Sequence, residues 1–295
     1  MERVGFIGLG SMGAPMAWNV NDGGFDLGVY NRTPEKMDPF AEAGIDTYES
    51  PGAVATSADA VVTMVRGPAA LREVVLGDDG IIETLEEDAV VVDTSTVSRT
   101  ATMEVSDAVE DAGGRYVDAP VLGTVGPAEA GELLVLAGAD DAVLAETRSL
   151  LEVFGDVRHV GSVGDGSSMK LTTNLLLGVM MEGFSEALAF ADGQDLPLET
   201  VLDVIQNGVL GAPLFEYKGE VVRNRDFDPQ FPVSLLGKDL DLVLDAAGED
   251  PLPLPATAAS REATSATKAL GYGDEDMMAL LKYLEGMTGE DIGTE

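Results

Sequence analysis

The sequence contains no cysteine and a single histidine, His159. The absence of cysteine excludes disulfides, thiolate nucleophiles and cysteine metal sites, and it says little about the cellular compartment. One histidine cannot form a histidine-rich metal site, and the glycine-rich turn after His159 is typical of a strand end. We therefore predict that the protein has no metal site.

Basic residues are also scarce. Lys plus Arg number 17 against 53 Asp plus Glu, the net charge is −36, and the acids are spread along the whole chain. Such a surface argues against binding nucleic acid or anionic membranes, which need basic patches. This excess of acidic residues, together with the low lysine content, resembles the composition of proteins from salt-accumulating halophiles, in which molar salt screens the repulsion between the acids. An ordinary acidic protein is the less favoured alternative.

The one run of 18 residues without a charge, residues 4–21, is broken by four glycines and a proline, and the first residues of the chain lack the basic start and small-residue cleavage site of a signal peptide. We therefore expect no membrane span and a cytoplasmic location. Its 295 residues, of which 45% are hydrophobic, can form a globular protein with two domains.

An apolar strand expected over residues 4–7 runs into glycines spaced as Gly-x-Gly-x-x-Gly, and a helix is expected over 14–20. The spacing alone is a weak signal, but a strand before it and a helix after it are the required context. These glycines permit a tight turn and close approach to a pyrophosphate at the helix N-terminus. We predict that the dinucleotide is bound by Phe6, Ile7, Gly8, Leu9, Gly10, Ser11, Met12 and Gly13.

The second expected strand, residues 25–30, ends in Asn31, Arg32 and Thr33. In an NAD enzyme this position carries an acidic residue for the ribose hydroxyls. An arginine can pair with a 2′-phosphate, whereas a carboxylate would repel it. We therefore predict that these three residues bind the cofactor and that NADP(H) is preferred, with NAD(H) possible. The alternative is a turn arginine that faces solvent.

The alternation of strands and helices continues to about residue 160. Further strands are expected over 60–65, 89–92, 116–121, 133–137 and 157–160, and helices over 68–76, 99–112 and 141–153. This order predicts a doubly wound, mostly parallel sheet, with ligands at the carboxyl ends of its strands. Ser95, Thr96 and the turn at Gly123–Thr124 fall at such ends, where they suit a carboxylate or a nicotinamide. Each could also be no more than a helix cap.

A long helix is expected over residues 168–192, with Ser167 or Ser168 as its N-cap. It is apolar on most of its circumference, which indicates burial in a core or between subunits. Lys170 lies in its first turn, and Asn174 follows four residues later on the same side. Lys170 is either a lysine that extends to solvent from the helix end or one that handles a proton beside an amide.

After this helix the alternation stops, and helices alone are expected, over 198–208, 215–222, 235–248, 256–270 and 276–284. The predicted fold is a Rossmann-type α/β domain, residues 1–162, followed by an all-helical domain, residues 163–295.

Taken together, these motifs resemble the β-hydroxyacid dehydrogenase family, to which 3-hydroxyisobutyrate dehydrogenase and tartronate semialdehyde reductase belong. The resemblance covers nearly the whole chain. It depends on five motifs in order, at residues 5–13, 93–96, 118–121, 164–174 and, as Phe231 followed by Lys238-Asp239-Leu240, 231–240.

The resemblance implies hydride transfer between a nicotinamide cofactor and a short β-hydroxy acid or its semialdehyde. It implies that Lys170 is the catalytic residue and that substrate is bound by Ser95, Leu122, Gly123, Thr124, Lys170 and Asn174. It adds to the cofactor site Met64, Val65, Thr96, Phe231 and Lys238. It also implies a homodimer or homotetramer in which the helical domains interlock.

Two positions depart from the family pattern. Leu122 stands where members usually have serine, and Thr173 stands where many have a second asparagine. The related 6-phosphogluconate dehydrogenases carry a histidine at the position of Thr173, and imine reductases usually lack the lysine, so both activities are weaker alternatives. A non-catalytic NADP-binding protein is a third alternative, although loss of Lys170 or Asn174 would be its mark.

Overall fold

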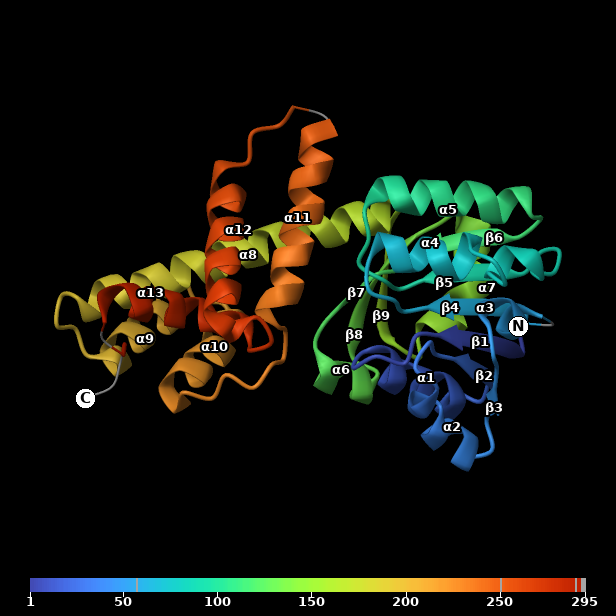
Figure 1. The fold of residues 1–295 in the computed structure, drawn as a ribbon, viewed down its shortest axis with the longest axis horizontal. Helices are drawn as coiled ribbons and strands as arrows, with labels where there is room; N and C mark the ends of the chain where they lie inside the picture. Colours follow the sequence, from blue (N-terminus) through green and yellow to red (C-terminus); the bar gives the residue numbers. More distant parts are fainter. Residues whose placement is uncertain (57, 250, 290, 293–295) are drawn as a thin grey trace. The chain divides into compact units, whose positions relative to one another are not determined.

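The structure is a computed structural model that describes residues 1–56, 58–249, 251–289 and 291–292. It divides into two compact units, Met1–Leu171 and Thr172–Glu295, and the division falls inside the long helix α8, Asp165–Asp192 (Figure 1). The predicted domain boundary lies in the turn just before this helix. The predicted second domain ends at residue 295, outside the described residues.

The N-terminal unit contains one sheet, of nine strands in the described residues, in the order β3-β2-β1-β4-β5-β6-β8-β7, with β9 also paired to β8. The β6–β8 and β7–β8 pairs are antiparallel and the others are parallel. The strands are β1 Arg3–Ile7, β2 Asp26–Tyr30, β3 Asp46–Thr47, β4 Ala60–Thr63, β5 Val90–Asp93, β6 Arg115–Asp118, β7 Val121–Leu122, β8 Leu133–Gly138 and β9 Gly155–Gly161. The mostly parallel, doubly wound sheet that the sequence predicts is confirmed.

Helices cover both faces of this sheet, as Figure 1 shows. One face packs on α1 Gly13–Asp22, α2 Asp38–Glu42, α6 Val125–Ala130 and α7 Asp141–Leu151. The other packs on α3 Pro51–Ala55, α4 Pro68–Leu76 and α5 Arg99–Asp111. Short 3₁₀ turns lie at Pro34–Lys36 and Ile81–Glu83. Because β4 and β5 are buried on both faces, their sequences are nearly continuous apolar runs.

The strand predicted over 116–121 is wrong in its extent. β6 ends at Asp118, and β7 is a separate short strand that pairs antiparallel with β8. Pro120 lies between them, and a proline has no N–H to donate to a sheet ladder. The ladder is therefore interrupted at Ala119–Pro120, while the chain keeps one antiparallel register along β8, in which Asp118 pairs with Gly138 and Val121 with Val135.

The start predicted for the long helix is also wrong, because α8 begins at Asp165. Ser167 is not a cap: its hydroxyl is 2.7 Å from that of Thr102, and its backbone N–H donates to Asp118 Oδ2 at 2.7 Å. The N–H of Gly164 donates to Asp118 Oδ1 at 3.0 Å. Two N–H groups around the helix start are thus satisfied by a carboxylate from β6, which periodicity within the helix cannot reveal.

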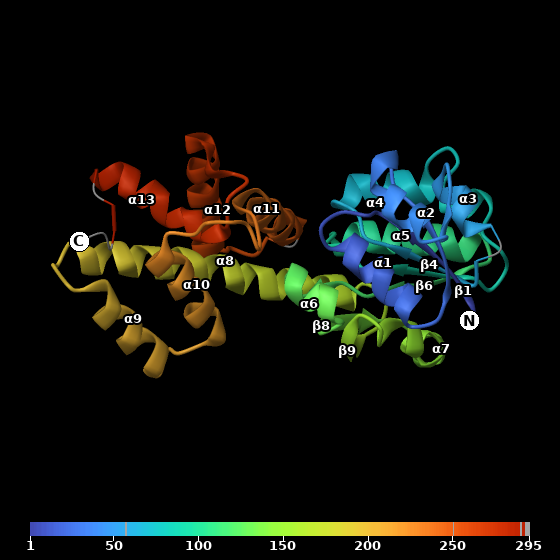
Figure 2. The same ribbon diagram turned by 90° about the horizontal axis from the view of Figure 1, so that it is seen from below.

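The C-terminal unit is all-helical, as predicted, and Figure 2 shows its helices arranged along the C-terminal part of α8. They are α9 Leu198–Asn207, α10 Pro213–Asn224, α11 Val233–Glu249, α12 Pro255–Thr267 and α13 Leu280–Thr288. The helix predicted over 256–270 ends earlier, at a π-helical turn over Lys268–Tyr272 in which Gly271 has φ of +98°. The helix predicted over 276–284 begins as a 3₁₀ turn at Met277–Ala279.

By length and composition, α8 is apolar enough to cross a membrane. A core helix of a globular domain passes the same test. Met181, Phe184 and Leu188 of α8 are buried in the core of the helical unit, together with side chains of α9 to α13. We therefore assign α8 to that core.

Candidate functional site

The glycine loop between β1 and α1 has the geometry of a phosphate-binding turn. Gly8 has φ of +102°, and a Cβ there would lie 2.3 Å from the carbonyl oxygen of Met64. A Cβ on Gly13 would lie 1.8 Å from the carbonyl oxygen of Gly8, whereas one on Gly10 would meet no atom within 4 Å. Two glycines are thus required by packing, and the third leaves open space beside the N-terminus of α1. The N–H groups there lack intrahelical partners and suit a pyrophosphate.

The three residues that end β2 have different surroundings. The Asn31 side chain accepts the N–H of Leu9 at 2.8 Å and donates to the carbonyl of Thr33 at 2.9 Å, so it ties the glycine loop to the strand end. Arg32 is exposed, with 82% of its side chain accessible, and lies 3.8 Å from Glu73 of α4. Thr33 is also exposed. Arg32 and Thr33 are therefore accessible to a cofactor bound at the loop, and Asn31 shapes that loop.

The residues after β4 lie against the same loop. The N–H of Met64 donates to the carbonyl of Ile7 at 2.9 Å, and Val65 Cγ1 is 3.2 Å from the position of a Cβ on Gly8. The N–H of Val65 donates to the buried hydroxyl of Ser95 at 2.9 Å. The structure thus brings the predicted cofactor residues Met64 and Val65 to the glycine loop. Ser95 and the half-buried Thr96 follow β5 beside them.

Three polar residues end neighbouring strands and pair in register: Thr63 of β4, Asp93 of β5 and Asp118 of β6. The Thr63 hydroxyl and the Ser95 N–H both donate to Asp93 Oδ1, at 2.7 and 3.1 Å. Burial raises the pKa of Asp93 above its ordinary value, against these hydrogen bonds. Burial likewise raises the pKa of Asp118 to about 7, although the Ser167 and Gly164 N–H groups oppose the shift. Asp93 therefore shapes the turn that carries Ser95.

Lys170 lies in the second turn of α8 and is 8% exposed. Its ammonium donates to the carbonyl oxygen of Val121 at 2.8 Å. A lysine that extends to solvent would keep this group in water, so that alternative is wrong. Because Val121 directly precedes Leu122, Gly123 and Thr124, the structure places Lys170 beside the turn predicted to bind substrate.

The Leu122–Thr124 turn is only partly buried. Leu122 is half-buried, in contrast to its neighbour Val121, which belongs to the core of the sheet. Gly123 has φ of +141°, and a Cβ there would lie 2.5 Å from Leu133 Cδ2. Thr124 is the N-cap of α6. The glycine is thus required by backbone and packing, and Leu122 is not needed to fill the core.

The other predicted site residues lie in the helical unit. Asn174, 2% exposed, donates to Asp239 Oδ2 at 2.5 Å. Lys238 Nζ lies 2.8 Å from Asp239 Oδ1, an ion pair by distance without hydrogen-bond geometry. Phe231 is half-buried, and its N–H donates to Asp276. Asp239 therefore joins Asn174 and Lys238 in one polar network.

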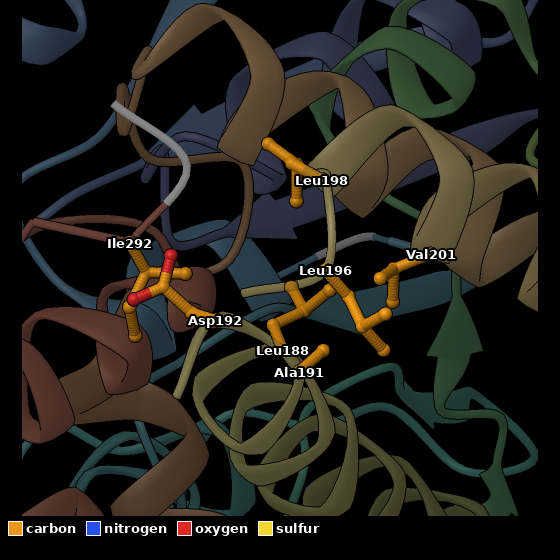
Figure 3. Close-up of a pocket in the computed structure, with 7 residues that line it drawn as sticks. All are labelled: Leu188, Ala191, Asp192, Leu196, Leu198, Val201 and Ile292. Atoms are coloured by element: carbon orange, nitrogen blue, oxygen red, sulfur yellow. The ribbon is translucent and has the colours of Figure 1, made fainter. Parts of the chain in front are cut away.

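A separate pocket of the helical unit is lined by none of the predicted site residues (Figure 3). Its walls are mainly aliphatic and come from α8, α9 and the segment between them, with Ile292 near the C-terminus: Leu188, Ala191, Asp192, Leu196, Leu198, Val201 and Ile292. It offers one carboxylate and no cation, so it does not suit an anionic substrate or a dinucleotide.

Sequence reasoning missed three polar groups that contact predicted site residues or the start of α8: the Asp118 carboxylate, the Val121 carbonyl and, in the helical unit, the Asp239 carboxylate. Asp118, Val121 and Asp239 all stand in motifs that the sequence singled out. Their roles depend on partners 49, 49 and 65 residues away in the chain, and no spacing rule reports such pairs.

A glycine-loop Rossmann unit with a buried lysine beside a strand-end turn defines the class: a nicotinamide-dependent oxidoreductase. Residues 3–164 match the family model described as the NAD binding domain of 6-phosphogluconate dehydrogenase. Residues 164–284 match the model described as NAD-binding of NADP-dependent 3-hydroxyisobutyrate dehydrogenase.

Relatives match the chain over almost its whole length. Glyoxylate/succinic semialdehyde reductase 1 of Arabidopsis thaliana is 36% identical, over 96% of this chain and 98% of that protein. The 2-(hydroxymethyl)glutarate dehydrogenase of Eubacterium barkeri is 34% identical, over 98% and 97%. The structure of Mycobacterium tuberculosis 3-hydroxyisobutyrate dehydrogenase with L-serine superposes with a TM-score of 0.90 at 27% identity, over 96% and 99%.

The chain belongs to the β-hydroxyacid dehydrogenase family. It is an NAD(P)-dependent dehydrogenase or reductase that acts on a CH–OH group, and its family uses small hydroxy acids.

Proposed function

We propose that the protein transfers a hydride between NADP(H) and a short hydroxy acid or its semialdehyde, with Lys170 as the proton donor and acceptor. The observation that carries this proposal is the buried ammonium of Lys170, bonded to the Val121 carbonyl beside the Leu122–Thr124 turn. The bound nicotinamide supplies the hydride or accepts it.

The protein supplies position and proton transfer. In the reducing direction, Lys170 gives a proton from Nζ to the carbonyl oxygen while the carbinol C–H bond forms; in the oxidising direction it takes the hydroxyl proton. The Val121 carbonyl orients this ammonium. The backbone at Gly123 and the Thr124 hydroxyl suit the substrate carboxylate, and Asn174, held by Asp239, suits a second polar group of the substrate.

The relatives' printed names indicate the class of substrate. Glyoxylate, succinic semialdehyde and 2-(hydroxymethyl)glutarate all carry a carboxylate together with an aldehyde or a hydroxymethyl group. Leu122 offers apolar surface where a serine would offer a hydroxyl, so a substrate with an apolar branch is favoured. A lost hydrogen bond to a charged group costs about 1.5–3 kcal/mol.

A substrate screen tests this proposal. With NADP(H) and NAD(H) in molar potassium chloride, we expect turnover of carboxylates that carry an aldehyde or a hydroxymethyl group. Because Leu122 offers apolar surface, we expect kcat/KM for 3-hydroxyisobutyrate to exceed that for the unbranched 3-hydroxypropionate by about tenfold. This ratio corresponds to a difference of about 1.4 kcal/mol in activation free energy. Leu122→Ser is the matched variant and should reduce the ratio. Absence of turnover across the set would refute the proposal.

Arg32 provides a test of cofactor preference. If its guanidinium pairs with the 2′-phosphate, Arg32→Asp lowers kcat/KM for NADPH at least about tenfold and leaves the value for NADH nearly unchanged. Glu73→Gln is the control, because it removes the ion-pair partner of Arg32 and keeps the guanidinium. Equal losses with both cofactors would mean that Arg32 stabilises the turn and does not discriminate.

The charge of −36 leads to a proposal about solvent. We propose adaptation to high salt: Tm should rise by about 10 °C or more from dilute buffer to molar potassium chloride, as screening relieves repulsion among the acids. At about 2–4 °C per kcal/mol for a protein of this size, that rise corresponds to a few kcal/mol. Sucrose is the uncharged control. An unchanged Tm in salt would contradict the proposal.

We also propose a homodimer or homotetramer. Leu176 and Phe190 of α8 are 57% and 71% exposed, and the small, exposed residues Gly183 and Ala187 lie between them at helical spacing. Large exposed apolar side chains at such spacing favour association with a second copy. Light scattering in molar salt measures the mass, and a monomer would contradict this proposal.

A further inference from the structure

Residues 118–121 form a short segment whose first and last residues, Asp118 and Val121, both contact α8, the helix that carries Lys170. We propose that Asp118 is a positioning residue for Lys170: its carboxylate fixes the start of α8, while Val121, three residues later, holds the ammonium. This inference depends on the proton-transfer role of Lys170 under the proposed function. It assigns Asp118 a part in the reaction through the lysine and not through contact with substrate.

The first end is the carboxylate. Asp118 has 0% exposure, and its two oxygens accept the N–H groups of Gly164 and Ser167 at 3.0 and 2.7 Å. Two glycines enclose it: a Cβ on Gly138 would lie 2.3 Å from Asp118 Oδ1, and one on Gly166 would lie 2.9 Å from Oδ2. A carboxylate so enclosed has one position, and the first turn of α8 is fixed with it.

The second end is the Val121 carbonyl, which accepts from Lys170 Nζ at 2.8 Å. The residues between the two ends are fixed to the sheet. The N–H of Ala119 donates to the carbonyl of Asp93 at 2.7 Å, and the carbonyl of Pro120 accepts from Leu136 at 2.9 Å. The backbone of Lys170, through the helix start, and its ammonium are thus both located by residues 118–121.

A buried helix cap with no part in catalysis is the competing explanation, and a double-mutant cycle separates the two. Asp118→Asn keeps the volume of the side chain but leaves one of the two N–H groups facing an amide donor. If Asp118 acts through Lys170, the substitution lowers kcat in the wild-type chain and changes little when Lys170 is already alanine. A general loss of structure lowers kcat by the same factor in both backgrounds.

The experiment measures kcat, KM and NADPH affinity in molar potassium chloride for Asp118→Asn, Lys170→Ala and the double variant. We expect Asp118→Asn to lower kcat about 10- to 100-fold, because small displacements of a catalytic group have effects of this size. In the Lys170→Ala background we expect less than about a twofold change, with NADPH affinity within about twofold throughout. Equal factors in both backgrounds would overturn the inference.

Asp165→Asn is the matched control. Asp165 lies at the same helix start and pairs with Arg99 at 2.6 Å, but it is partly exposed and does not contact the N–H groups of Gly164 or Ser167. It should therefore leave kcat unchanged. If Asp118→Asn does not fold, Pro120→Gly replaces it, since a flexible residue 120 uncouples the two ends, and the same cycle applies. A Lys170→Ala enzyme with normal kcat would refute the proposed function itself, which is a distinct result.

Discussion

Lys170→Ala should lower kcat by about two to four orders of magnitude, the usual contribution of a positioned acid–base group. The lysine is buried, and its ammonium lies against the Val121 carbonyl at the carboxyl side of the sheet. Alanine leaves no proton donor there. NADPH affinity should change little, because the predicted dinucleotide site lies at the β1–α1 loop and the end of β2.

The measurement is steady-state kinetics together with fluorescence titration of NADPH. Lys36→Ala is a control for the loss of one positive charge, since Lys36 is an exposed lysine of the same unit. Asn174→Ala should raise KM more than it lowers kcat, because its amide is assigned to substrate binding and not to proton transfer. A near-normal kcat in the Lys170→Ala enzyme would show that Lys170 takes no part in proton transfer.

Lys218→Met should destabilise the helical unit by about 3–5 kcal/mol, the cost of leaving one charge of a buried pair without its partner. Lys218 of α10 and Asp276 are both buried, and both carboxylate oxygens lie 2.9 Å from Nζ. The same carboxylate accepts the N–H groups of Gln230, Phe231 and Met278. The pair therefore fixes the segment that carries Phe231.

Chemical denaturation in molar potassium chloride, followed by far-ultraviolet circular dichroism, measures the loss. Arg223→Met is the matched control: its partners Glu199 and Glu220 are both exposed, and such pairs contribute about 0–1 kcal/mol each. The double variant Lys218→Met with Asp276→Asn should recover part of the stability, because it leaves no uncompensated buried charge. If Lys218→Met and Arg223→Met lower the free energy of unfolding by equal, small amounts, burial does not increase the contribution of the Lys218–Asp276 pair to stability.

The local parts of the candidate site were predictable from the sequence. Gly8, Gly10 and Gly13 stand between a strand and a helix, and the structure gives packing reasons for two of them and open space at the third. The division into an alternating and an all-helical region was also predictable, because periodicity and breaker residues are local signals. The order of motifs along the chain was enough to indicate the family.

The position of Lys170 was not predictable in the same way. The sequence left open whether its ammonium reaches solvent, and the decision depended on Val121, 49 residues away. The start of α8 was misplaced for a similar reason: the sequence offers Ser167 and Ser168 as caps, whereas the fold uses Asp118. A helix cap supplied by a distant strand cannot be recognised from the spacing of residues within the helix.

What the sequence alone determined is therefore local: the glycine turn, the alternation of strands and helices, and the arginine at the end of the second strand. Local backbone preferences and apolar periodicity are properties of neighbouring residues, so they can be read along the chain. The tertiary structure decided which buried polar groups meet. Lys170 with Val121, Asn174 with Asp239, and Lys218 with Asp276 are joined by chain folding, because a buried polar group needs a partner wherever the fold supplies one.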